Sequence, residues 1–348
     1  MPPPWLRRPV SVTAWLLMST LALIGSPLLL AGAELASLVR RDDRPRIAAR
    51  VVLAYFLREL TTLVACGGLW VASGCGLWMQ TRRLRDWHWR LLGWFVGGLA
   101  NAAFRTVQIR VAEEGTEEAL QKLSEDGPVL VFSRHAGPAD TVLLIDRLLR
   151  RFERRPSVVF KEAIALDPSV DLISHRLPHA VLDTDDREQC EARIVHAAES
   201  MGQRGALLLF PEGGNFSPER RLKALGSLRR RGHRQAAQRG EQMHHVLPPR
   251  PSGALCALDA APDAPVVFAA HTGLGLAAYP REIWRELPVG GTLHTRMWLV
   301  ARDEVPSDND ARCTWLNDWF QRIDDWIDVH GTEPSAGRSR PRDGASAG

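Results

Sequence analysis

The chain has 348 residues, of which 45% are hydrophobic and 24% charged, and a formal net charge of +4. This size suits one large folded domain with an additional segment, and the small net charge argues against a protein that coats nucleic acid. Its five scattered cysteines form no CxxC pair, which argues against a disulfide framework or a zinc site and for a reducing compartment.

Two long stretches without a charged residue lie near the amino terminus, Val10–Ala33 and Leu60–Met79. At 1.5 Å per residue each is long enough to cross a hydrocarbon core of about 30 Å. The first could instead be a signal peptide, although its apolar core is long for one. Arginines flank both stretches on every side, so the second is either re-entrant or interfacial, or the arginines between them lie outside.

We therefore expect residues 1–100 to be a membrane-anchoring segment of transmembrane or interfacial helices in the cell membrane, with the rest of the chain facing the cytoplasm. Trp87, Trp89 and Trp94 follow the second stretch beside a cluster of arginines. They are typical of an interfacial aromatic belt, or else of ordinary core packing.

From about residue 100 the pattern is that of an α/β domain, expected to span residues 101–330. Alternation of apolar strand-like runs with helical patterns predicts a mixed, mostly parallel sheet flanked by helices, with ligands at the carboxyl ends of strands. A last helix is expected at 310–329, followed by a disordered tail at 331–348. The expected strands are 106–111, 129–133, 157–160, 180–182, 206–210, 265–270 and 292–300, and the other expected helices are 116–125, 141–152 and 187–203.

The first motif with chemical content follows the apolar run 128–133 and contains His135 and Asp140. Five residues apart across a strand-to-helix turn, a carboxylate can orient an imidazole and raise its basicity. Such a pair can take a proton from an alcohol. Pro138 suits an early position of the helix that follows.

The second motif follows the apolar run 206–209 and reads Phe210-Pro211-Glu212-Gly213-Gly214. It supplies a carboxylate and two glycines that let a ligand approach the backbone closely. Together the two motifs indicate acyl transfer onto a hydroxyl group.

With both motifs in view, over about residues 105–305, the chain resembles the glycerolipid acyltransferase superfamily, whose best-known members acylate lysophosphatidate. The resemblance implies that His135 is the base, that Asp140 orients it, and that Glu212 and Gly213 shape the acceptor pocket. It also implies a lysophospholipid acceptor in phospholipid biosynthesis and acyl-CoA or acyl carrier protein as donor, with no further cofactor and no metal. Lys161 and Arg250 match the second and fourth motif regions of the family.

The chain departs from the family at the positions that normally carry phosphate-pairing arginines. Gly214 and Asn215 stand where the third motif has Thr-Arg, and Thr184 stands where the second motif ends in Arg. The acceptor then either lacks a simple phosphomonoester or meets a nearby guanidinium. The arginines that could substitute are Arg134, which replaces the usual Asn before the histidine, and Arg187, Arg220 and Arg221.

Three further features bear on function: a basic run, a set of histidines, and the alternatives to acylation of a lysophospholipid. The basic run from Arg220 to Arg239 is either a solvated helix face or a surface for anionic lipid head groups, coenzyme A or acyl carrier protein. His244, His245 and His271 lack the spacing of a metal site. The alternatives in function are acylation of another lipid alcohol or glycolipid, and a non-catalytic membrane protein that binds lipid.

Overall fold

The computed structural model describes residues 3–106, 109–115, 117–161, 164, 166–182, 186–272, 284 and 291–331. Within these residues lies a seven-stranded sheet in the order β1-β7-β6-β2-β5-β3-β4. All neighbouring strands are parallel except β6 and β7, so the predicted mixed, mostly parallel α/β sheet is confirmed. The strands are β1 (Ile109–Gly115), β2 (Val129–Ser133), β3 (Arg155–Lys161), β4 (Ala180–Leu182), β5 (Gly205–Leu209), β6 (Val266–His271) and β7 (Gly291–Val300).

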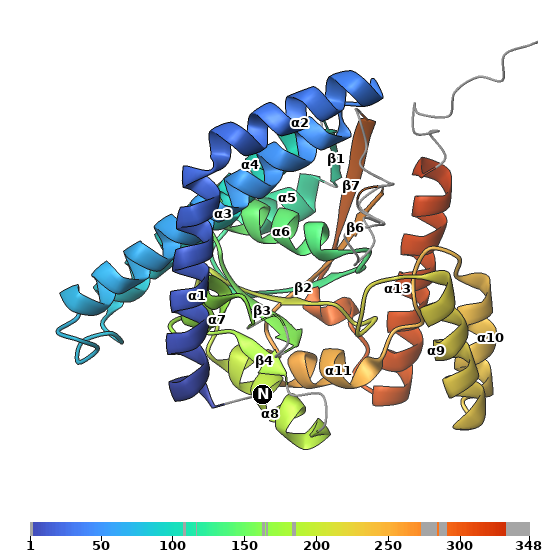
Figure 1. Ribbon diagram of the computed structural model, residues 1–348. Helices are drawn as coiled ribbons and strands as arrows, with labels where there is room; N and C mark the ends of the chain where they lie inside the picture. Colours follow the sequence, from blue (N-terminus) through green and yellow to red (C-terminus); the bar gives the residue numbers. More distant parts are fainter. Residues whose placement is uncertain are drawn as a thin grey trace, which may run out of the picture.

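Helices cover both faces of the sheet (Figure 1). Alternate side chains of β2 point to opposite faces: Phe132 packs with one group of helices and Val131 with the other. Because both faces are covered, β2, β5 and β6 are buried along their whole length and consist almost entirely of apolar residues. On the face of Phe132 lie α8 (Arg187–Glu199), α11 (Pro251–Ala260) and α13 (Asn309–His330), and on the face of Val131 lie α5 (Glu117–Ser124), α6 (Pro138–Asp146) and η1 (Arg147–Arg151).

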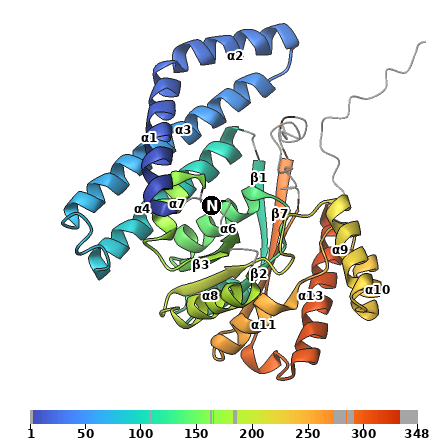
Figure 2. The ribbon, with the colours of Figure 1, turned by 60° about the horizontal axis from the view of Figure 1, so that its bottom comes forward.

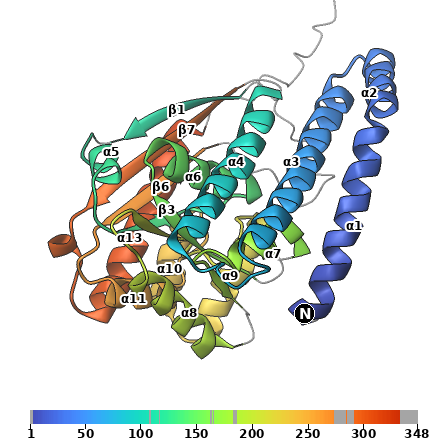
Figure 3. The same cartoon turned by 90° about the vertical axis from the view of Figure 1, so that its left-hand side faces the viewer.

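Four amino-terminal helices form an outer layer beyond α6 (Figure 3). Phe95 and Leu92 of α4 join Ile173 of α7 in a shared apolar cluster. Arg7 and Arg8 bind the buried carboxylate of Asp171 at 2.8 and 3.0 Å and so tie α1 to α7. The four helices are α1 (Pro4–Ile24), α2 (Ser26–Arg40), α3 (Arg44–Ala72) and α4 (Arg82–Thr106), and α7 spans Pro168–Ser174.

The two expected membrane spans take a different form from the predicted one. The first breaks at Gly25, between α1 and α2, because Pro27 has no backbone N–H to continue the helix. The second is the end of α3, which starts at Arg44 and contains Arg58 and Glu59, followed by turns. Among the described helices none alone is long and apolar enough to cross a membrane, and α1 and α2 meet that test only as a pair bent by 61°.

Several element boundaries also differ from those predicted. β1 is displaced from 106–111 to Ile109–Gly115, and α4 continues to Thr106. β1 continues to Gly115 because it pairs with β7 along its whole length, and the carboxylate of Glu113 lies 3.7 Å from Arg147. Of the expected tail at 331–348, all but Gly331 lies outside the described residues. No bounds were predicted for α7, α9 (Pro218–Arg230), α10 (Arg234–Gln242) and α11, although a solvated helix face was one of the two interpretations of the run Arg220–Arg239. α9 and α10 lie beside α13 (Figure 2).

The tryptophans of α4 divide between core and surface. Trp89 is buried in the cluster that joins α4 to α7, whereas Trp87 and Trp94 are 47% and 43% exposed. Core packing therefore accounts for Trp89 only.

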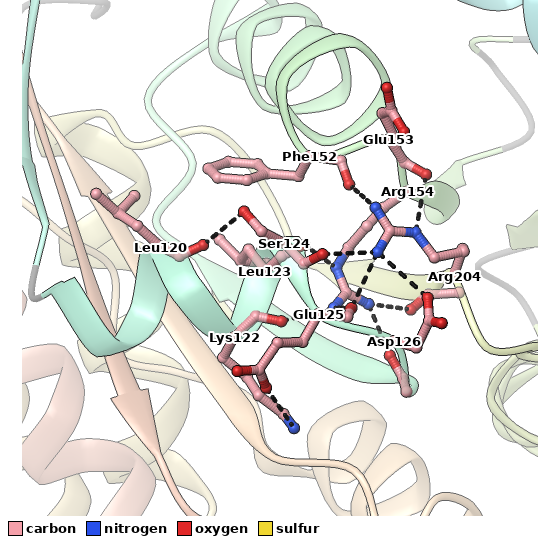
Figure 4. Close-up of polar contacts among 12 residues, drawn as sticks. Leu120, Lys122, Leu123, Ser124, Glu125, Asp126, Phe152, Glu153, Arg154 and Arg204 are labelled. Carbon is pink, nitrogen blue, oxygen red and sulfur yellow. Dashed lines mark hydrogen bonds and ion pairs between the residues drawn. The ribbon is translucent and has the colours of Figure 1, made fainter.

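A buried arginine joins the amino ends of the central strands to α5 (Figure 4). The Arg154 guanidinium donates five hydrogen bonds of 2.7–3.1 Å to main-chain carbonyls. Arg204 beside it donates to the carbonyls of Ser124 and Glu153 and shares that of Glu125. Burial, with the neighbouring Arg204, lowers the pKa of Arg154 to about 10. This arginine lies at the opposite end of the strands from the two motifs. The five carbonyls belong to Lys122, Leu123, Glu125, Gly127 and Gly205.

Candidate active site

The two motifs meet because β2 and β5 are parallel neighbours. Phe132 and Leu209 are paired in register, so the turns that follow both strands leave the same edge of the sheet. The His135 N–H donates to Glu212 Oε1 at 2.5 Å, and the rings of His135 and Phe210 stack with centroids 4.3 Å apart. The structure thus brings His135, Asp140 and Glu212 together.

His135 and Asp140 form the expected hydrogen-bonded pair. His135 Nδ1 lies 3.1 and 3.2 Å from the two carboxylate oxygens of Asp140. The same carboxylate accepts the backbone N–H groups of Ala136 and Gly137 at 2.7 and 3.0 Å and the hydroxyl of Thr141 at 3.1 Å. These donors converge because Asp140 lies in the first turn of α6, where backbone N–H groups have no helical partner.

The charge on Asp140 fixes which nitrogen of His135 is basic. Burial alone would raise the pKa of Asp140, but hydrogen bonds from His135 and His271 hold it far below its ordinary value. An ionised carboxylate keeps the imidazole proton on Nδ1 and leaves the lone pair on Nε2. Nε2 has no hydrogen-bond partner among the described residues, and the His135 side chain is 19% exposed.

Glu212 is a buried link between two backbone segments. Its Oε1 accepts the His135 N–H and its Oε2 accepts the Leu247 N–H at 2.7 Å. Burial raises the pKa of Glu212 to about 8, against the opposing effects of Arg134 and the two backbone donors. Gly213 follows with φ +69°, a conformation that glycine adopts without strain.

The segment that binds Glu212 is itself held by Asp324, which the sequence did not identify. This buried carboxylate of α13 accepts the N–H groups of His244, His245 and Val246 at 2.8, 2.5 and 3.0 Å. Asp324 follows Ile323 in an amphipathic helix, and nothing in that pattern distinguishes it from a surface acid.

Arg134 is buried and directed at the backbone rather than at solvent. Its guanidinium donates to the carbonyls of His271 at 2.7 Å and His245 at 3.0 Å. Burial lowers its pKa, and the charges of Glu212, Asp140 and Asp324 oppose that shift. Arg134 therefore joins β6 to the loop that carries Leu247.

Among the other arginines, two lie against the glycine turn. A Cβ atom on Gly213 would lie 3.1 Å from Arg250 Cδ, and one on Gly214 would lie 3.4 Å from Arg220 Nη1. Both arginines are exposed. Arg220 donates to the Asn215 carbonyl at 3.1 Å, whereas the Arg250 guanidinium makes no hydrogen bond or ion pair with the described residues.

The remaining predicted site residues either bind groups away from the two motifs or lie outside the described part of the chain. Arg221 donates to main-chain carbonyls at the end of α10, and Arg187 pairs with Glu191 at 2.7 Å. Lys161 ends β3, but its side chain and residues 183–185 are outside the described part of the chain. Their roles stay predictions.

The comparisons with known proteins bear on this region. The family model described as Acyltransferase matches residues 112–268, which include both motifs and most of the sheet. Comparison with curated proteins and with solved structures finds no match.

Proposed function

Residues 112–268 belong to the glycerolipid acyltransferase superfamily, and we propose that the chain is a membrane-bound O-acyltransferase of phospholipid biosynthesis. It moves a fatty acyl group from acyl-CoA or acyl carrier protein to the hydroxyl of a lysophospholipid, with lysophosphatidate as the expected acceptor. The observation that carries this proposal is the contact between His135 Nδ1 and the fully buried Asp140, which leaves Nε2 open.

The reaction follows from this pair. His135 Nε2 takes the proton of the acceptor hydroxyl while its oxygen attacks the thioester carbonyl, so that a C–O bond forms and the C–S bond breaks. The imidazolium, stabilised by Asp140, returns the proton to the leaving thiolate. Because a thioester is already activated, the transfer needs no cofactor beyond the donor itself.

Arg250 and Arg220 support an anionic acceptor. Both cations lie against the Gly213–Gly214 turn, and Arg250 has its donors free of described partners. A guanidinium binds a phosphate group through two parallel hydrogen bonds. We propose that these two arginines take over from the arginines that the second and third motifs lack.

The amino-terminal helices support attachment to a membrane. Leu17, Leu21, Ile24 and Leu28 recur at helical spacing along α1 and the start of α2, and all are 61–82% exposed. An apolar face of this size is typical of a surface that enters a bilayer. All five cysteines are free, which fits a protein whose catalytic domain faces the cytoplasm of the cell.

The test is acyl transfer by the full chain in bilayer vesicles, with labelled acyl-CoA or acyl carrier protein as donor. The acceptors are lysophosphatidate, lysophosphatidylcholine and monoacylglycerol. We expect transfer to lysophosphatidate, and Arg250→Gln should raise its KM by about 10–100-fold, since a hydrogen bond to a charged group contributes about 1.5–3 kcal/mol. Arg193→Gln, which changes an exposed arginine of α8, is the matched control and should leave KM unchanged.

Other results of this assay would change the acceptor or the function. Transfer confined to monoacylglycerol or lysophosphatidylcholine would keep the acyltransferase and replace the acceptor. No transfer to any acceptor from either donor would contradict the proposed function and favour a lipid-binding protein.

A further inference from the structure

Asp140 is close to a second histidine, which is buried at the end of β6. His271 is the last residue of β6, which pairs with β2 in parallel up to Ser133 and Ala269. The residue is 1% exposed, and its Nε2 lies 3.4 Å from Asp140 Oδ2. Neither ring nitrogen has a regular hydrogen-bond partner among the described residues, so the ring is a buried polar group that the mechanism above does not use.

The surroundings of His271 keep its ring uncharged. The charged and titratable groups that face it are Asp140, Arg134 and His135. Burial lowers the pKa of His271, the charges of Arg134 and His135 lower it further, and Asp140 only partly opposes them. A neutral ring with Nε2 toward a carboxylate carries its proton on Nε2.

A neutral donor affects Asp140 differently from a cation. It orients the carboxylate and supports its ionised form, but adds no positive charge that would compete with the imidazolium of His135. Arg134 fixes this arrangement, because it donates to the carbonyl of His271 at 2.7 Å.

We propose that His271 is a positioning residue that holds Asp140 in place as a neutral Nε2–H donor. This inference rests on the proposed function, in which His135 is the base. Without the donor on His271, Asp140 directs more of its charge to His135, which then holds its proton more tightly. The acidic limb of the pH profile of kcat/KM therefore moves to higher pH. In addition kcat falls, because a carboxylate that is no longer held in place orients His135 less well.

The kinetic test compares His271→Phe, which fills the space without a donor, with His271→Gln, whose amide N–H can replace the imidazole N–H. Both are assayed as the full chain in bilayer vesicles with lysophosphatidate and a thioester donor. For His271→Phe we expect kcat about 10-fold lower, KM within about twofold, and an acidic limb displaced upward by about half a pH unit. His271→Gln should restore the limb and most of kcat. A wild-type pH profile in His271→Phe, or equal impairment of both variants, overturns the inference.

A second measurement does not depend on the folding of these variants or on activity. Nitrogen NMR of the histidine-labelled wild-type chain should show His271 as a neutral Nε2–H ring between about pH 6 and 8, and Asp140→Asn should shift its resonances. A cationic ring or an Nδ1–H ring overturns the inference. Undiminished transfer by His135→Ala would instead remove the proposed base and leave the NMR result to decide on His271.

Discussion

Glu212 shows how a single buried side chain can couple proton binding to stability. A carboxyl whose pKa rises from 4.5 to about 8 in the folded chain takes up a proton on folding within that window. The folded state then binds more protons than the unfolded state, so the free energy of unfolding falls as pH rises toward 8. The lowered pKa of His271 acts in the opposite sense, but only below the ordinary histidine value of 6.5.

We therefore expect Glu212→Gln to lose part of the decline in stability that the wild type shows between about pH 6.5 and 8. The measurement is the unfolding midpoint of both proteins across that range in detergent. Equal slopes would contradict the shifted pKa. The variant should also be less stable overall, because the oxygen of the introduced amide can replace only one of the two carboxylate oxygens that accept backbone N–H groups.

The site residues that lie inside short sequence motifs can be predicted from the sequence, whereas those that come from distant parts of the chain cannot. His135, Asp140 and Glu212 lie in short patterns with a chemical meaning, and the structure brings them together. His271 and Asp324 carry no such signal, because each reaches the site from an element distant in the chain. Only the strand order and the packing of α13 bring them there.

Among the elements, α5 and the amino ends of the central strands are linked by the hydrogen bonds of Arg154, and a substitution there tests how much this link contributes to stability. One guanidinium donates to five main-chain carbonyls, of which only that of Glu125 also accepts from Arg204 among the described side chains. A lysine has neither the reach nor enough donors to replace it. We expect Arg154→Lys to lower the free energy of unfolding by about 2–4 kcal/mol, since buried carbonyls are left without donors. Its exposed neighbour Arg155 pairs with Asp86 at the surface, so Arg155→Lys should change stability by less than about 1 kcal/mol. Comparable losses in chemical unfolding of the two variants would refute this role of Arg154.

Elements were predicted where the apolar pattern was strong. β2, β5 and β6 are continuous apolar runs buried on both faces, and they were found within a residue or so of their predicted bounds. α9 and α10 had no predicted bounds, because they are rich in arginine and bury little beyond Leu225 and Ala237. The break at Gly25 was missed because the absence of charge indicated one long span, whereas the proline that follows ends the helix.

In the molecule as a whole, the exposed apolar face of α1 and α2 and the basic run Arg220–Arg239 of α9 and α10 lie on different layers. The exposed leucines of α1 and α2 belong to the outer layer beyond α6, while α9 and α10 lie beside α13, on the other side of the sheet (Figures 2 and 3). If the first surface enters the bilayer, the second is left to meet an anionic donor from the aqueous side.

This arrangement predicts which leucines hold the protein on a membrane. Leu21→Glu combined with Leu28→Glu should weaken flotation with liposomes by more than about 10-fold, because each buried leucine contributes about 1.5–3 kcal/mol. Leu222→Glu, on α9, removes a leucine of similar exposure, 66% against 68% and 82%, and should float like the wild type. Loss of flotation in Leu222→Glu alone would reverse the assignment of the two surfaces.

The central claim is that His135 is the base of an acyl transfer, and one comparison tests it most directly. Labelled acyl transfer to lysophosphatidate is measured for the wild type, for His135→Ala, and for His196→Ala, which removes an exposed histidine of α8. We predict that His135→Ala lowers kcat by about 100-fold or more, as expected for loss of a general base, while His196→Ala matches the wild type. Transfer by folded His135→Ala at the wild-type rate would contradict the account.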